Sequence, residues 1–334
     1  MRAAFHAGAE PPPQCRQRPR RAAFLKRQVR QPDMSGICEN RVVIVTGAGR
    51  GLGRAYALGL AREGAKVVVN DLGVGTHGDA TGETPAQLVV EEIRAMGGEA
   101  VANYDDVSDY EAGRRIVTAA VDSFGDLHAV VNNAGFVRDR MFVSCTPDEW
   151  DAVLRVHLRG HFCTSRHAVD YWRAQQKAGK AVEARIINTS SGAGLQGSVG
   201  QSAYAAAKAG IATLTLVQAA ELRRYGITAN GLAPNARTRM TETAFAEAMK
   251  AKADEFDVFA PENTAPLVAW LCSARSSDVT GQIFELIGGK IRVALGWTDG
   301  PEFDKGERWE AAELGDKILQ LVADRPAAKR VYGA

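Results

Sequence analysis

The chain has 334 residues, of which 46% are hydrophobic, and its formal net charge is +2. This length is enough to bury one large hydrophobic core or two modest ones. Residues 1–33 hold eight basic and two acidic side chains, which leaves the rest of the chain with a net charge of −4. A mildly acidic body argues against nucleic-acid binding, and no apolar run approaches the roughly 20 residues that cross a bilayer.

The cysteines and the first residues bear on location. The five cysteines are scattered, without a C-x-x-C or other metal-ligand spacing, which favours reduced thiols in a cytoplasmic enzyme. Residues 1–33 contain a Pro triplet and many Arg but lack the apolar segment of a secretory signal. We therefore expect residues 1–39 to be a disordered or non-native basic extension. A transit peptide and a basic interaction tail are the alternatives.

From residue 40 onward, short β-rich runs alternate with helical patterns. The predicted helices include residues 52–63, 85–96 and 109–124, and Thr146 with Glu149 forms a capping-box pattern before a long helix. Uninterrupted apolar strands separated by helices predict a Rossmann-type, doubly wound, seven-stranded parallel sheet in a single α/β domain. We expect this domain to span residues 40–290, and the tail, 291–334, to carry one helix near 309–323. The predicted strands are residues 41–46, 66–70, 100–104, 129–132, 185–190, 227–233 and 282–286.

The segment TGAGRGLGRA, residues 46–55, lies between the first strand and the first helix. Its glycines, Gly47, Gly51 and Gly53, let the backbone turn sharply and approach a pyrophosphate closely. The start of the helix adds N–H groups and the positive end of its dipole. This strand–turn–helix context predicts a dinucleotide site.

Asp71 follows the second strand, about twenty residues after the glycines, which is the spacing of a dinucleotide site. A carboxylate there can accept hydrogen bonds from both hydroxyls of an adenosine ribose, and it would repel a 2′-phosphate. The alternative is a solvated turn residue. The spacing favours the ribose partner and therefore predicts NAD.

Tyr204 and Lys208 stand four residues apart in QSAYAAAKAG, so a helix would place both on one face. An adjacent ammonium favours the phenolate and is expected to lower the pKa of Tyr204, which is ordinarily near 10. Ser191, thirteen residues upstream of Tyr204, can donate to a substrate oxygen. An ordinary exposed helix pair is the alternative, but the glycine turn and Ser191 argue against it.

Two imidazoles, His157 and His161, also stand four residues apart, a spacing that suits a metal pair. The segment lacks the Glu of a metalloprotease helix and an obvious third ligand, so we predict no metal. His157 is expected instead to order water or backbone near the site.

Residues 40–290 resemble the short-chain dehydrogenase/reductase family. The resemblance rests on five features in the family's order: TGAGRGLG, YDDVSD, VNNAG, the Ser–Tyr spacing and Y-x-x-x-K. Within that family, VVVNDLG, NNAGFVRDRMF, RVHLRGHF and APLVAWLC resemble the (3R)-hydroxyacyl-CoA dehydrogenase domain of the peroxisomal multifunctional β-oxidation enzyme and its stand-alone bacterial relatives.

The resemblance implies a complete set of site residues. The catalytic residues would be Ser191, Tyr204 and Lys208, with His157 as an accessory and with Ser191 and Tyr204 also binding substrate. The cofactor-binding residues would be Gly47, Arg50, Gly51, Leu52, Gly53, Asp71, Asp106, Val107, Asn133, Ala134, Gly135, Tyr204, Lys208, Ala236 and Arg239.

Three positions depart from the broad family pattern. His157 stands where an Asn of the proton relay is usual, Asn235 replaces the Gly of a P-G pair, and Arg239 replaces a Thr. The charged loop Arg138–Arg140 is either solvated surface or a contact to the phosphates of a thioester substrate.

The resulting prediction is NAD-dependent oxidation of a secondary alcohol, with a (3R)-3-hydroxyacyl-CoA, linear or on a steroid side chain, as the favoured substrate. A 17β-hydroxysteroid dehydrogenase is the alternative, and a non-catalytic nucleotide-binding protein on the same fold is the alternative from another class. Asp71 disfavours a reductase of fatty-acid synthesis. The resemblance further implies a homodimer or homotetramer, with no nucleic-acid partner and no membrane span.

Overall fold

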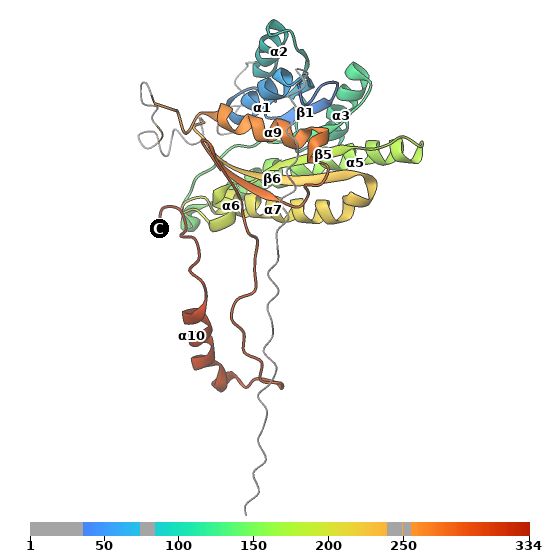
Figure 1. Cartoon of the computed structure of the whole chain (residues 1–334). Coiled ribbons are helices and arrows are strands. Elements are labelled where there is room, and N and C mark those ends of the chain that lie inside the picture. Colours follow the sequence, from blue (N-terminus) through green and yellow to red (C-terminus); the bar gives the residue numbers. More distant parts are fainter. Residues whose placement is uncertain (1–35, 74–83, 239–248, 250–254) are drawn as a thin grey trace, which may run out of the picture. The chain divides into compact units, whose positions relative to one another are not determined.

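An eight-stranded sheet lies at the centre of the part of the chain that the computed structural model describes, residues 36–73, 84–238, 249 and 255–334 (Figure 1). The strands are β1 (Val42–Thr46), β2 (Lys66–Asn70), β3 (Glu99–Asn103), β4 (Ala129–Asn132), β5 (Ala184–Thr189), β6 (Ile227–Asn235), β7 (Ile283–Ile287) and β8 (Lys290–Val293). They lie in the order β3-β2-β1-β4-β5-β6-β7-β8. Neighbours from β1 to β7 pair in parallel, and β8 pairs antiparallel with β7.

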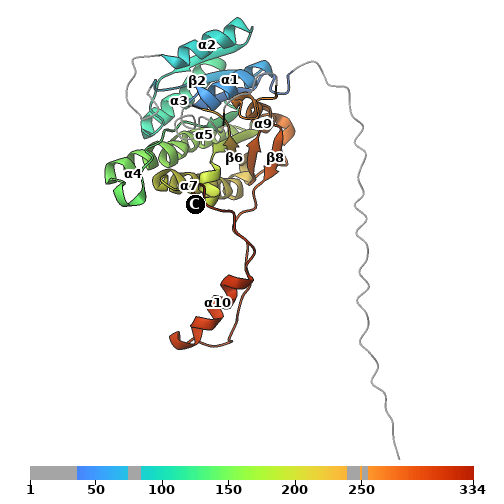
Figure 2. The ribbon, with the colours of Figure 1, turned by 90° about the vertical axis from the view of Figure 1, so that its left-hand side faces the viewer.

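Helices cover both faces of this sheet (Figures 1 and 2). Helices α1, α2 and α9 pack together on one face, and α3, α5 and α7 lie on the other, where α4 contacts α7. The helices are α1 (Gly51–Arg62), α2 (Pro85–Ala95), α3 (Tyr110–Phe124), α4 (Pro147–Leu154), α5 (Gly160–Lys177), α6 (Gly192–Gln196), α7 (Ser202–Leu222), α9 (Ala265–Cys272) and α10 (Leu314–Asp324).

The apolar strands divide their side chains between two cores. Val43 and Val45 of β1 pack with the helices of the first face, whereas Val42 and Ile44 pack with those of the second. Successive side chains of a strand point to opposite faces, so a strand covered on both sides is apolar on both, as the four buried Val and Ile residues of β1 show. The uninterrupted apolar runs of the sequence have this origin.

The strand order reverses between β1 and β4, because the chain moves outward from β1 through β2 to β3 and then returns to the other side of β1. In open α/β sheets, ligands bind at the carboxyl ends of the strands at such a switch point. The glycine turn after β1 and the segment after β4 meet at this point.

The predicted Rossmann-type fold is confirmed, with two local differences. The sheet has an eighth strand, β8, whose four residues are all exposed, so no apolar run marked it in the sequence. The predicted long helix after Thr146 is divided into α4, a π-helical turn (Arg155–Arg159) and α5. Its capping box, formed by Thr146 and Glu149, is present.

The predicted division into an extension, a domain and a tail stays a prediction, since residues 1–35 lie outside those the structure describes. The tail does contain the predicted helix, α10. Its side chains are exposed except for Leu314 and Leu321, which are half-buried. No helix among the described residues is long and apolar enough to cross a membrane.

Candidate active site

The ends of β1 and β4 are joined by side-chain hydrogen bonds. The Thr46 hydroxyl accepts from the backbone N–H groups of Asn133 (3.0 Å) and Ala134 (3.1 Å). The Asn133 amide donates to the carbonyl oxygens of Thr46 and Gly47, each at 3.1 Å. These bonds fix the segment after β4 against the glycine turn. The sequence analysis did not select Thr46, although it opens the TGAG motif.

The glycine turn leaves no room for side chains. A Cβ on Gly47, whose φ is +61°, would lie 2.7 Å from the Ala134 Cα, and one on Gly53 would lie 2.1 Å from the Gly47 carbonyl oxygen. Arg50 is the N-cap of α1, Leu52 lies in its first turn, and no acidic side chain stands in that turn. A close-packed turn feeding a helix whose first turn carries no acidic side chain fits the pyrophosphate of a dinucleotide.

Asp71 lies directly beside this turn. One of its carboxylate oxygens accepts from the Gly49 N–H (2.8 Å), and the other accepts from the Gly73 N–H (2.9 Å). Because a carboxylate oxygen has two lone pairs, each keeps the capacity to accept one more hydrogen bond. The structure thus brings Asp71 and the glycines together, as a ribose partner requires.

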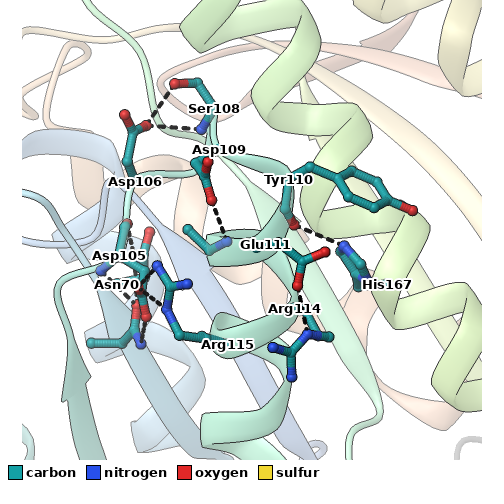
Figure 3. A network of polar contacts seen from close by, with 12 residues as sticks. Asn70, Asp105, Asp106, Ser108, Asp109, Tyr110, Glu111, Arg114, Arg115 and His167 are labelled. Carbon is teal, nitrogen blue, oxygen red and sulfur yellow. Dashed lines mark hydrogen bonds and ion pairs between the residues drawn. The ribbon is translucent and has the colours of Figure 1, made fainter.

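The loop after β3 carries Asp106, whose contacts with Ser108 are drawn in Figure 3, and Val107. One Asp106 oxygen accepts from both the N–H and the hydroxyl of Ser108, each at 2.8 Å, and the other lies 3.9 Å from an Arg155 nitrogen. Val107 is buried against Gly160, where a Cβ would approach it to 2.9 Å. These contacts fix the loop, and its contact with adenine stays a prediction.

Ser191, Tyr204 and Lys208 come together as predicted. Ser191 is the N-cap of α6, where its hydroxyl accepts from the Ala193 N–H at 3.2 Å. Tyr204 and Lys208 lie one turn apart on α7, with the ammonium 5.6 Å from the centre of the phenol ring. The Ser191 side chain interacts with the Tyr204 hydroxyl and acts to lower its pKa. The Lys208 Nζ donates to the Thr189 carbonyl at 2.6 Å, so both ends of the cluster are fixed to the end of β5.

The charge state of the cluster differs from the expectation. Burial raises the pKa of Tyr204, and the interaction with Ser191 opposes this rise. Burial lowers the pKa of Lys208 from 10.5 to about 7. The expectation that Lys208 would bring the pKa of Tyr204 below its ordinary value is therefore wrong for this structure. Desolvation disfavours both charged forms, so burial opposes the phenolate of Tyr204 and the ammonium of Lys208.

His157 lies in the π-helical turn and is 1% exposed. Its Nε2 is 2.7 Å from the Phe136 carbonyl oxygen and 3.1 Å from the Phe136 nitrogen, and its ring stands perpendicular to Tyr204 with the centres 5.3 Å apart. Burial and the nearby Lys208 lower the pKa of His157 to about 3, so the ring is neutral. A Cβ on Gly135 would lie 2.1 Å from this ring, which explains the glycine. His157 thus holds backbone near the site, as predicted.

His161 is also buried, and burial lowers its pKa well below the ordinary value. Within the described ranges, no three or more His, Cys, Asp or Glu side chains are arranged to hold a metal ion.

The segment after β6 contains the remaining predicted cofactor residues. Ala236 is buried, and the next residue, Arg237, is held by Asp257 and by the Phe259 carbonyl, to which its N–H donates at 2.7 Å. The Thr238 side chain faces Gly51, whose Cβ would lie 3.5 Å from it. Arg239 lies outside the described residues.

Comparisons with known proteins agree with this geometry. Residues 41–249 match the family model described as short chain dehydrogenase. The chain is 43% identical over 304 residues to the hydroxyacyl-CoA dehydrogenase ChsB1 of Mycobacterium tuberculosis, an alignment that covers 88% of this chain and 90% of the relative. It is 47% identical over 253 residues to the peroxisomal multifunctional enzyme type 2 of Mus musculus, covering 76% of this chain and 32% of that longer protein. The crystal structure of a short chain dehydrogenase from Mycobacterium avium matches with a TM-score of 0.81 and 58% identity, covering 90% of this chain and 100% of that one.

Proposed function

The chain belongs to the short-chain dehydrogenase family, as its motifs predicted, and from this premise we propose that it oxidises a (3R)-3-hydroxyacyl-CoA with NAD. The observation that carries the proposal is the cluster of Ser191, Tyr204 and Lys208 at the same edge of the sheet as the glycine turn. A nicotinamide cofactor accepts a hydride from the alcohol carbon. A non-catalytic nucleotide-binding protein would have no need of this buried polar cluster.

The roles of the three side chains follow from their contacts. The Ser191 hydroxyl donates to the substrate oxygen and holds it next to Tyr204. The Tyr204 phenolate accepts the hydroxyl proton as the ketone forms. Because burial makes the phenolate costly, its formation depends on positive charge nearby, which the protonated form of Lys208 provides.

Asp71 supports NAD over NADP. Its carboxylate is anchored by two backbone N–H groups, so it cannot easily turn away from an additional phosphate. A 2′-phosphate there would meet a fixed negative charge and would lose the hydrogen bonds of the ribose hydroxyls.

The substrate class is supported by the relatives. One relative that aligns over nearly its whole length is named a hydroxyacyl-CoA dehydrogenase, and a second is named a peroxisomal multifunctional enzyme. This chain spans about a third of the second, so only the dehydrogenase step is part of the proposal. We also propose a cytoplasmic location, which cell fractionation would test, and a homodimer or homotetramer, which light scattering would test.

The experiment that tests the proposal is steady-state kinetics with NAD and NADP on three groups of substrates. These are the (R) and (S) isomers of short and long 3-hydroxyacyl-CoAs, and 17β-hydroxysteroids. We expect the (R) thioesters with NAD to give the highest kcat/KM, and Tyr204→Phe to abolish most of it. A strict preference for the (S) isomers, or for free steroids, would overturn the substrate assignment.

A further inference from the structure

The segment between Ser191 and Tyr204 determines how these two side chains face each other. It contains α6 and the residues that lead into α7, with Gly197 and Gly200 at φ of +82° and +75°. The ten residues 192–201 connect Ser191 to the start of α7, and we call them the connection. Because the connection contains such turns, its position depends on what packs against it.

One side of this connection is held by the charged loop after β4. The Arg140 N–H donates to the Gly200 carbonyl at 2.7 Å, and the Gln201 amide donates to both Asp139 oxygens at 3.1 Å. Arg140 itself pairs with Glu149 of α4. The Asp139 carboxylate is therefore occupied by Gln201, and the Arg140 guanidinium is paired through its Nε with Glu149.

The other side is held by the last residues of the same chain. The Val199 N–H donates to the Tyr332 carbonyl (2.9 Å), the Tyr332 N–H donates to the Gly197 carbonyl (3.2 Å), and the Gln196 amide donates to the Arg330 carbonyl (2.8 Å). Lys329 forms an ion pair with Glu285 of β7 at 2.6 Å, which anchors the segment to the sheet.

These contacts place the Tyr332 phenol next to the proposed catalytic serine. A Cβ on Gly192, the residue after Ser191, would lie 2.5 Å from the Tyr332 hydroxyl oxygen and 3.0 Å from its ring. Tyr332 remains 41% exposed, so part of the phenol faces outward beside Ser191. The neighbouring segments also meet through Val331, which lies against Gly197, and Val199, which lies against Gly333.

We propose that Tyr332 is a substrate-positioning residue. Its hydroxyl hydrogen-bonds the thioester carbonyl of the acyl substrate. A 3-hydroxyacyl thioester carries its carbonyl two carbons from the reacting carbon. Ser191 holds the oxygen on the reacting carbon, so a polar group that lies against the next residue, Gly192, is placed to meet the carbonyl two carbons away. The inference rests on the proposed function for its substrate class, while the contact between the C-terminal segment and the connection does not.

The contact is tested without substrate. Deleting Arg330–Ala334 should accelerate hydrogen–deuterium exchange of the peptide containing Val199 by about tenfold or more, because its N–H loses its acceptor. Unchanged exchange at Val199 would show that the C-terminal segment does not hold the connection, and the proposal would be overturned.

The positioning role is tested by kinetics with a (3R)-3-hydroxyacyl-CoA. Tyr332→Phe should raise the KM for this substrate by about threefold to tenfold, the value of one net hydrogen bond, and Tyr332→Ala should raise it further. The KM for NAD and the Tm should not change, and Tyr225→Phe, which removes a remote phenol hydroxyl, is the matched control. An unchanged KM in Tyr332→Ala, or an equal rise in the KM for NAD, contradicts the role.

The two proposals fail in different ways. If the wild type oxidises no 3-hydroxyacyl-CoA, the proposed function fails, and the KM comparison is then made with the secondary alcohol that the wild type does oxidise. If the wild type oxidises 3-hydroxyacyl-CoAs and Tyr332→Ala has wild-type constants, Tyr332 has no positioning role and the proposed function stands.

Discussion

Replacing Lys208 should reveal a buried lysine that destabilises the folded protein near neutral pH. Its side chain is 2% exposed, and burial lowers its pKa to about 7 from 10.5. Its Nζ hydrogen-bonds the Thr189 carbonyl. Lys208→Met keeps a similar volume and removes the titrating group, so a comparison of the two proteins isolates the charge.

The sign follows from proton uptake. Between pH 7 and about pH 10 the unfolded lysine is protonated, while the folded one is mostly neutral, so unfolding takes up a proton. The free energy of unfolding should therefore rise with pH in this window, by up to ~1.4 kcal/mol per pH unit for this one group. The stability gained as the pH rises is complete above the pKa that Lys208 has in the unfolded chain. It is lost as the pH falls toward 7, the pKa of Lys208 in the folded protein.

The assay is urea denaturation of wild type and Lys208→Met at pH 7, 8 and 9, without cofactor. The difference in unfolding free energy, wild type minus variant, should grow by about 2 kcal/mol from pH 7 to pH 9. Lys177→Met, at the exposed end of α5, is the control and should leave the pH dependence unchanged. A difference that stays flat or shrinks as the pH rises would refute the lowered pKa.

Four further predictions concern the site and the first residues. Tyr204→Phe should leave NAD binding unchanged and lower kcat by about 10²-fold or more, measured by titration calorimetry and steady-state kinetics; activity within a few-fold of wild type would contradict the role. Asp71→Ser should reduce a preference for NAD over NADP that we expect to be about a hundredfold or more, as kcat/KM with both cofactors would show. Gly135→Ala should destabilise the protein by about 1–3 kcal/mol, because the new Cβ meets the His157 ring, and by less in a His157→Ala background. Deleting residues 1–33 should leave activity and Tm unchanged, since that sequence has no packing periodicity.

The strands and the dinucleotide turn were predictable because their signals are local. A strand buried on both faces must be apolar throughout, and β2 was placed at its observed bounds from KVVVN alone. The exposed strand β8 has no such requirement, because it pairs at the edge of the sheet through its backbone. The π-helical turn at Arg155–Arg159 changes the helical repeat by a fraction of a residue per turn, too little to read from five side chains.

The composition of the active site was predictable, but its electrostatics were not. Helical spacing alone brings Tyr204 and Lys208 to one face of α7. Their pKa values depend on how deeply neighbouring elements bury them, and sequence spacing carries no information on burial. The surroundings of His157 were likewise not visible in the sequence. Its spacing to His161 suits a metal pair, whereas the structure shows its ring packed against Gly135.

Tyr332 shows where the limit of sequence reasoning lies. The connection between Ser191 and Tyr204 is held by Asp139 and Arg140 on one side and by residues near the C-terminus on the other. The contacts with the C-terminal residues use mainly backbone groups, which every residue carries and which leave no motif in the sequence. The residues that we propose to perform the chemistry are visible in the sequence, because chemistry needs particular side chains. The segments that hold those residues in place emerge only from the fold, and the proposed role of Tyr332 could be inferred there alone.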